Sequence, residues 1–203
     1  MTQNKEKIYR LCKKYKINNY TINDDGSIDV DGDVYLSLSS LHILPLRFNK
    51  VSGYFDCSCN ILTSLEGSPR EVGDGFYCYR NNLISLKGCP KVVGGYFNCS
   101  ENDLTSLIGS PEVLNSTFDC NKNNLTSLDG LPKELNGNIY FSTNNLHPFY
   151  ERVYGEIGNK LSIFVKYMDY YEVFKPAHRP TLKPIFKKQN GLYLISDIKD
   201  GLL

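Results

Sequence analysis

The sequence predicts an α/β repeat solenoid, in which short coils stack on one another, share a parallel sheet and are capped at both ends. Three observations support this prediction. A motif recurs every 21 residues from residue 30 onward, the same positions of each copy are apolar, and the segments outside the copies follow another pattern. Self-similarity at a fixed period of this length is typical of solenoid proteins.

The repeat is plain when two segments are compared. Residues 51–71 read VSGYFDCSCNILTSLEGSPRE, and residues 93–113 read VGGYFNCSENDLTSLIGSPEV. The common pattern is F-x-C-x-x-N-x-L-x-x-L-x-G-x-P, with a degenerate first copy at 30–50 and a last copy that decays after NNLHPF. Alternate residues of a strand point to the same side, so the Phe and Cys of each copy are expected in the core. The predicted inward columns are Phe55, Phe76, Phe97, Phe118 and Ile139; Cys57, Cys78, Cys99 and Cys120; Leu62, Leu83, Leu104, Leu125 and Leu146; and Leu65, Leu86, Leu107 and Leu128.

An asparagine follows three residues after each inward cysteine. Its side chain has two donors and an acceptor, and can satisfy backbone groups where each coil turns. The Gly and Pro of the motif are expected to shape an outer turn. The predicted asparagine ladder is Asn60, Asn81, Asn102, Asn123 and Asn144.

These columns resemble the leucine-rich repeat, whose core reads L-x-x-L-x-L-x-x-N-x-L. The resemblance covers residues 30–150 and implies a short horseshoe of about six coils, with the parallel sheet on its concave face. The repeat sequence FDCSxNxLTSLxGxPKEVGG also resembles a subfamily of these repeats that is found in tailed phages and some bacteria. That resemblance implies an origin, and it implies no reaction.

A stack of coils exposes apolar surface at its two ends, so caps are expected. Residues 1–29 are predicted as an N-terminal cap, with a helix whose apolar stripe is Ile8, Leu11, Cys12 and Tyr15. Residues 151–203 are predicted as a small, mostly helical C-terminal cap, with helices expected near 148–159 and 161–174. The alternative for this segment is an effector domain.

Composition excludes several protein classes. The chain has 203 residues, is 41% hydrophobic and 22% charged, and carries a formal net charge of +1, which gives no general attraction to nucleic acid or anionic lipid. We expect no membrane span and no secretory signal. Seven cysteines without such a signal favour free thiols in the cytoplasm. We expect a monomer or a weak homo-oligomer.

No motif of catalysis or metal binding emerges. Zinc sites need ligands that converge on a point, whereas the cysteine column spreads along the solenoid axis. The stretch DDGSIDVDGD lacks the last glutamate of a calcium-binding EF-hand loop. His42, His147 and His178 lie far apart in the sequence without a triad pattern. We therefore expect no enzyme activity, no cofactor and no metal.

The outward positions beside the inward Phe and Cys vary between copies, and tyrosine is frequent among them. Tyr and Arg are common at the energetic centres of protein interfaces, because they bury large areas and keep a polar tip. Ser58 and Ser100 are also expected to point outward in this region. The predicted partner-binding residues are Tyr54, Asp56, Tyr77, Tyr79, Arg80, Tyr96, Asn98, Asp119, Lys122 and Tyr140.

The sequence thus favours a non-enzymatic binding module for a protein partner. The phage resemblance implies a host protein that is bound during takeover or to counter defence. The alternative is a nucleotide or nucleic-acid ligand stacked on the same tyrosines. The carboxylates of Asp56, Glu101 and Asp119 disfavour that alternative.

Overall fold

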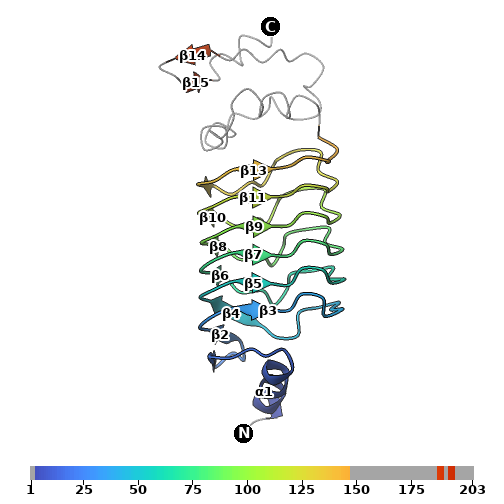
Figure 1. Ribbon diagram of the computed structural model, residues 1–203, viewed down its shortest axis with the longest axis vertical. Coiled ribbons are helices and arrows are strands. Elements are labelled where there is room, and N and C mark those ends of the chain that lie inside the picture. The colour runs from blue at the N-terminus through green and yellow to red at the C-terminus, as the bar shows by residue number, and fades with distance from the viewer. Residues whose placement is uncertain (1–2, 147–186, 190–191, 195–203) are drawn as a thin grey trace.

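The computed structural model describes residues 3–146 together with the short segments 187–189 and 192–194. Residues 3–146 form a β-solenoid of about five turns that begins with one short helix (Figure 1). The predicted repeat architecture is confirmed. In the described part of the chain, no helix is long and apolar enough to cross a bilayer.

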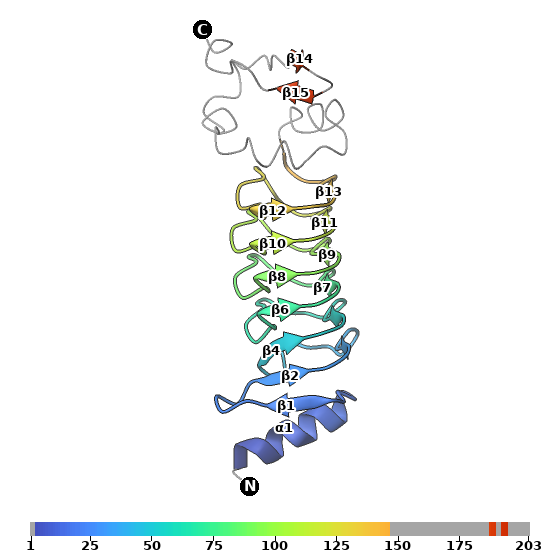
Figure 2. The ribbon, with the colours of Figure 1, turned by 90° about the vertical axis from the view of Figure 1, so that its left-hand side faces the viewer.

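The N-terminal helix α1 (Gln3–Lys14) begins the solenoid, as predicted. Ile8 and Cys12 are buried in the core, and Leu11 and Tyr15 pack partly buried against it. Strand β1 (Tyr20–Ile22) follows and pairs antiparallel with β2 (Ile28–Val30). In Figure 2, α1 and β1 lie together at the N-terminal end of the stack, so one end of the apolar core is covered.

The coils build two parallel sheets, which corrects the expectation of a single sheet with one strand per coil. The first sheet continues from β1 and β2 into β4 (Phe48–Val51), β6 (Glu71–Val72), β8 (Val92–Val93), β10 (Val113–Leu114) and β12 (Glu134–Leu135). The second sheet consists of β3 (Val34–Tyr35), β5 (Phe55–Asp56), β7 (Phe76–Tyr77), β9 (Phe97–Asn98), β11 (Phe118–Asp119) and β13 (Ile139–Tyr140). The repeat stays in register, since Val51 pairs with Val72 and Phe55 pairs with Phe76.

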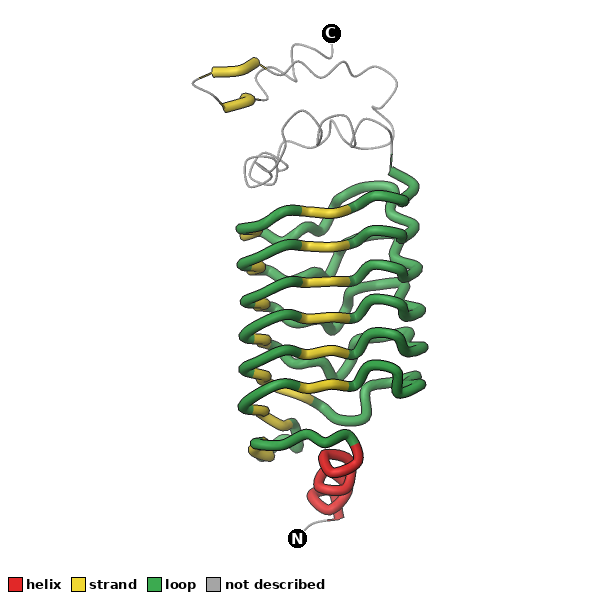
Figure 3. Tube along the Cα trace, in the orientation of Figure 1, coloured by secondary structure: helices red, strands yellow, loops and turns green. Residues whose placement is uncertain are grey.

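The remaining side of each coil consists of loops and turns (Figure 3). The motif glycines Gly67, Gly88, Gly109 and Gly130 adopt φ values of 92–96°, a region that favours glycine, so the predicted outer turns are explained. The coils follow one another along a straight axis in Figures 1 and 2. The curvature of a horseshoe, and with it a concave face, is not seen.

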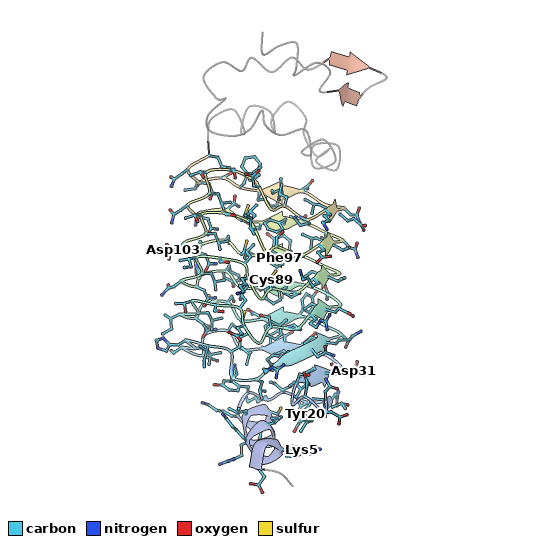
Figure 4. All side chains as sticks on the ribbon, turned by 180° about the vertical axis from the view of Figure 1, so that it is seen from behind. Lys5, Tyr20, Asp31, Cys89, Phe97 and Asp103 are labelled. Atoms are coloured by element: carbon cyan, nitrogen blue, oxygen red, sulfur yellow. The ribbon has the colours of Figure 1, made fainter. Side chains whose placement is uncertain are left out.

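The predicted inward columns form the core. In the complete repeats every Phe, Cys and Leu of these columns is buried, and Phe97 lies inside the stack in Figure 4. The rings of Phe55, Phe76, Phe97 and Phe118 stack with centroids 5.0–5.5 Å apart and interplanar angles of 5–17°. Each buried ring contributes roughly 1.5–3 kcal/mol through removal of apolar area from water, so the column ties successive coils together.

The asparagine ladder also forms as predicted. Oδ1 of Asn81 accepts a hydrogen bond from the Leu62 amide of the preceding coil at 2.9 Å. Its Nδ2 donates to the carbonyls of Cys57 and Cys78, each at 3.1 Å. Each asparagine therefore satisfies buried backbone groups of two adjacent coils at once.

All seven cysteines lie among the described residues, and all are free thiols. Burial raises the pKa of Cys57, Cys78, Cys99 and Cys120 well above the ordinary thiol value. Cys89, in an outer turn, is buried too, and its Sγ donates to the Gly109 carbonyl at 2.9 Å. These thiols pack as small apolar groups.

The predicted C-terminal cap falls mostly outside the described residues, including both helices expected near 148–159 and 161–174. Two strands in this part of the sequence are described, β14 (Lys187–Gln189) and β15 (Leu192–Leu194), and they pair antiparallel. The boundaries of the three predicted segments remain predictions.

Candidate binding surface

The second sheet presents a surface that we call the tyrosine face, defined by Tyr35, Tyr54, Tyr77, Tyr96 and Tyr140. Each strand of this sheet has two residues, and the first points inward while the second points outward. Parallel pairing brings the outward residues into one row, in which each residue is the direct neighbour of the next. The row is Tyr35, Asp56, Tyr77, Asn98, Asp119 and Tyr140.

Three tyrosines of two different rows form one stack of rings. Tyr54 and Tyr96 precede their strands, whereas Tyr77 is the second residue of β7. The ring centroids of Tyr54 and Tyr77 lie 6.1 Å apart, and those of Tyr77 and Tyr96 lie 6.0 Å apart, with tilts of 33° and 36°. These geometries are favourable for aromatic pairs, so three of the predicted partner-binding tyrosines form one cluster, and Tyr79 is not part of it.

Gly75 makes this stack possible. It occupies the position that Tyr54 and Tyr96 hold in the neighbouring coils, and a Cβ at Gly75 would lie 2.7–2.9 Å from the ring and hydroxyl of Tyr77. The missing side chain leaves the space that the Tyr77 ring fills between its two neighbours. The glycine is thus a packing requirement of the tyrosine face.

Carboxylates hold several of these phenols in place. Oη of Tyr35 donates to Oδ2 of Asp33 at 3.0 Å, and Oη of Tyr96 donates to Oδ2 of Asp119 at 2.8 Å. The hydrogen bond to Asp33 raises the pKa of Tyr35, and burial together with the bond to Asp119 raises the pKa of Tyr96 strongly. Both phenols are therefore neutral hydrogen-bond donors at physiological pH, with fixed side-chain rotamers.

Tyr54 and Tyr77 lie in the same negative field. The charge of Asp74 and a hydrogen bond to it raise the pKa of Tyr54. Burial raises the pKa of Tyr77, and the charges of Asp74 and Asp56 add to that shift. Neither Asp33 nor Asp74 belongs to the predicted set, because their role depends on side-chain geometry that the repeat pattern does not specify.

Two serines that follow strands of the second sheet were expected to point outward, and this prediction is wrong. Ser58 and Ser100 are buried, because their hydroxyls donate to Oδ1 of Asp56 at 2.6 Å and of Asn98 at 2.7 Å. The same oxygens accept the backbone amides of these serines at 2.9 Å. Tyr79 is half-buried, and among the described residues its ring stacks on no other ring.

A row of residues in the left-handed backbone region borders the tyrosine face. Cys59, Arg80, Glu101 and Lys122 have φ values of 51–53°. Arg80 Nε bonds Oε2 of Glu101 at 2.9 Å, and Lys122 Nζ bonds Oε1 of the same residue at 3.2 Å. The two predicted basic residues at this border are thus paired within the protein.

The tyrosine face has an excess of negative charge. Its two cations, Arg80 and Lys122, share the Glu101 carboxylate. The carboxylates on or beside the face are Asp33, Asp56, Asp74, Glu101 and Asp119. Such a field attracts cationic groups and repels phosphates.

Two hollows lie elsewhere on the described surface. One of about 470 Å³ lies between α1 and the turns at 43–47 and 66–67. Another of about 420 Å³ runs over the outer side of β1, β2, β4, β6 and β8. Neither is lined by a tyrosine, and the described residues contain no group of three His, Cys, Asp or Glu residues able to hold a metal ion.

Comparisons with protein-family models, with curated proteins and with solved structures give no match to this chain. The resemblance to leucine-rich repeats therefore rests on the residue pattern alone.

Tyr35 was missed as a candidate, although it stands in the predicted outward row. It is 60% exposed, compared with 45% for Tyr140 and 38% for Tyr54. The signal that could have found it is its register with Asp56 and Tyr77 at a spacing of 21 residues. The tyrosine face thus extends over all six strands of the second sheet.

Proposed function

We propose that this protein is a non-enzymatic binding module that holds a protein partner on its tyrosine face. The observation that supports this most directly is the stack of Tyr54, Tyr77 and Tyr96, in which the rings are 6.0–6.1 Å apart and partly exposed. Rings of this size bury 150–250 Å² each, and tyrosine is enriched among residues that dominate interface energies.

The scaffold under the stack favours binding without rearrangement. The inward neighbours Phe55, Phe76 and Phe97 are fully buried, and the phenols of Tyr35 and Tyr96 are fixed by carboxylates. A surface whose rotamers are already set loses less conformational entropy when a partner binds. A regular sheet on a solenoid provides this rigidity over several coils.

The amino-acid sequence of the repeats supports a partner in a host cell. Its resemblance to phage-type repeats favours a protein that acts on a host protein in the cytoplasm, during takeover or to counter defence. Seven free cysteines, six of them buried, fit a reducing compartment. The partner and the compartment are parts of the proposal that rest on the sequence pattern.

A nucleotide or nucleic-acid ligand is the less favoured occupant of the same face. Bases can stack on tyrosine rings. However, phosphates would meet the carboxylates of Asp33, Asp56 and Asp119, while Arg80 and Lys122 are engaged by Glu101. A protein surface is therefore the better match.

The proposal is tested by affinity capture from lysate of the native host cell, with bound proteins read by mass spectrometry. Tyr77→Ala/Tyr96→Ala removes two rings of the stack, and it is expected to lose a partner that the wild type retains. Gly75→Ala is expected to weaken capture as well, because the added Cβ displaces the Tyr77 ring without removing it.

The matched control is Ile84→Ala/Ile108→Ala. It removes two large side chains that are 68% and 69% exposed and lie outside the second sheet. This control is expected to capture the same proteins as the wild type. An identical protein list from the tyrosine variant and the wild type would refute binding on the tyrosine face.

A further inference from the structure

Asp56 occupies the centre of an aromatic group on the tyrosine face. It is the second residue of β5 and pairs directly with Tyr35 of β3 and Tyr77 of β7. Neighbouring strands are about 4.8 Å apart, so its carboxylate lies between two phenol side chains. Tyr54 precedes the same strand, and its ring stacks on that of Tyr77. The charge of Asp56 contributes to the raised pKa of both Tyr35 and Tyr77.

The two oxygens of this carboxylate are used differently. Oδ1 accepts the backbone amide of Ser58 at 2.9 Å and its hydroxyl at 2.6 Å. Oδ2 has no hydrogen-bond donor anywhere in the described part of the chain. The carboxylates of Asp33 and Asp119 use both of their oxygens. Asp56 therefore has a strong acceptor left over at the middle of the face.

We infer that Asp56, with Tyr35, Tyr54 and Tyr77 around it, receives an arginine or lysine side chain of the protein partner. The inference rests on the proposed function and adds the chemistry of the contact. A carboxylate oxygen forms charge-assisted hydrogen bonds with such cations, and tyrosine rings attract them as well.

Charge complementarity selects this occupant over the others. The face carries five carboxylates against two cations, and both cations bond Glu101. An acidic peptide or a nucleic acid would add negative charge to this field, whereas a basic segment reduces it. The half-buried environment of Asp56 also strengthens the contact relative to one in open water.

The chain itself supplies the variant that isolates the charge. Asn98 occupies the equivalent position two strands away, and its Oδ1 accepts the amide and hydroxyl of Ser100 at 2.9 and 2.7 Å. Asp56→Asn should therefore keep the local hydrogen bonds to Ser58 and remove only the negative charge. Unchanged circular dichroism and an unchanged melting temperature are the check on folding.

Asp103→Asn is the matched control. It makes the same change of net charge at an exposed loop position, where the adjacent coils already have Asn82 and Asn124. Figure 4 places Asp103 on the loop side of the stack, away from Asp31 and the first sheet. Any general effect of protein charge on a cationic probe should appear equally in both variants.

The probe is a fluorescein-labelled peptide of alternating glycine and arginine, measured by fluorescence anisotropy at low salt with the full chain. The wild type is expected to bind it more tightly than the matching glycine–glutamate peptide and than a single-stranded oligonucleotide. Asp56→Asn is expected to weaken binding about tenfold, the size of one charge-assisted hydrogen bond, while Asp103→Asn changes it less than about twofold.

Equal binding of the arginine peptide by the wild type and Asp56→Asn would overturn the inference, as would preference for the glutamate peptide or the oligonucleotide, or no binding at all. The proposed function is judged separately by the Tyr77→Ala/Tyr96→Ala capture experiment. Loss of a captured partner there, combined with an unchanged peptide affinity in Asp56→Asn, would retain the tyrosine face as the interface and reject the cationic contact.

Discussion

The asparagine ladder gives the sharpest stability prediction, and Asn102 is its best test site. Its Nδ2 donates to the carbonyls of Cys78, Cys99 and Ser100, each at 3.1 Å, and its Oδ1 accepts the Leu83 amide at 3.0 Å. Asn102 is 8% exposed and Leu83 is fully buried. Asn102→Ala removes all four contacts, and water has little access to replace them.

The expected loss follows from the groups left without a partner. A buried amide that loses its acceptor costs about 1–3 kcal/mol, and an orphaned buried carbonyl costs a similar amount. The amide of Leu83 and at least one carbonyl are affected, so the free energy of unfolding should fall by roughly 2–6 kcal/mol. That is a large share of the roughly 5–15 kcal/mol typical of a folded domain.

The measurement is urea unfolding of the full chain, followed by far-UV circular dichroism, with hydrogen exchange at the Leu83 amide as a local probe. Asn82→Ala is the control, because this exposed neighbour makes no side-chain hydrogen bond among the described residues. It should change the free energy of unfolding by less than about 0.5 kcal/mol. A loss in Asn102→Ala within about 1 kcal/mol of that control would refute the role given to the ladder.

Two further predictions concern thiols and backbone strain. Under native conditions at pH 8, iodoacetamide should modify half-exposed Cys59 much faster than Cys78, because burial blocks the Cys78 thiol and raises its pKa; equal rates by mass spectrometry would contradict the buried column. Leu38→Asn should raise the free energy of unfolding by roughly 0.5–1 kcal/mol, since Leu38 is 81% exposed with φ 54°, a conformation that asparagine tolerates better. An unchanged or lower urea midpoint would argue against strain at Leu38.

The core could be predicted from the sequence because each of its columns repeats one residue type. Phe, Cys, Asn and Leu recur at identical positions of every complete copy, and all of them are buried where expected. Amphipathic spacing likewise predicted the buried side of α1. A single copy of the motif would leave open which of its apolar residues face the core. Their recurrence at the same positions in every copy identifies them.

The first sheet could not be predicted in the same way. Its strands β6, β8, β10 and β12 have two residues each, of which only the second is buried, so each coil marks this sheet with a single apolar position. The sequence feature that could have indicated this sheet is the apolar residue that recurs at positions 72, 93, 114 and 135. With strands on two sides of every coil, both sides advance by about 4.8 Å per coil. In a horseshoe, successive coils are farther apart on the convex side than on the concave side. Equal spacing on both sides therefore gives a straight stack.

The candidate surface was predicted as outward columns of residues, but the contacts between their side chains were not. The tyrosine cluster depends on Gly75, which the sequence shows only as a gap in a variable column. The burial of Ser58 and Ser100 depends on side-chain hydrogen bonds to their neighbours Asp56 and Asn98. These contacts depend on side-chain conformations, which the spacing of apolar residues does not specify.

The fixed register has a consequence for how such a protein can change over time. Every coil ends where the next begins, in the same orientation, so duplication or loss of one 21-residue unit leaves the core columns continuous. Such an event lengthens or shortens the exposed sheet by one strand, about 4.8 Å. The binding surface can therefore evolve in two ways that preserve the fold. Recombination adds or removes whole coils, and point substitution changes single outward side chains.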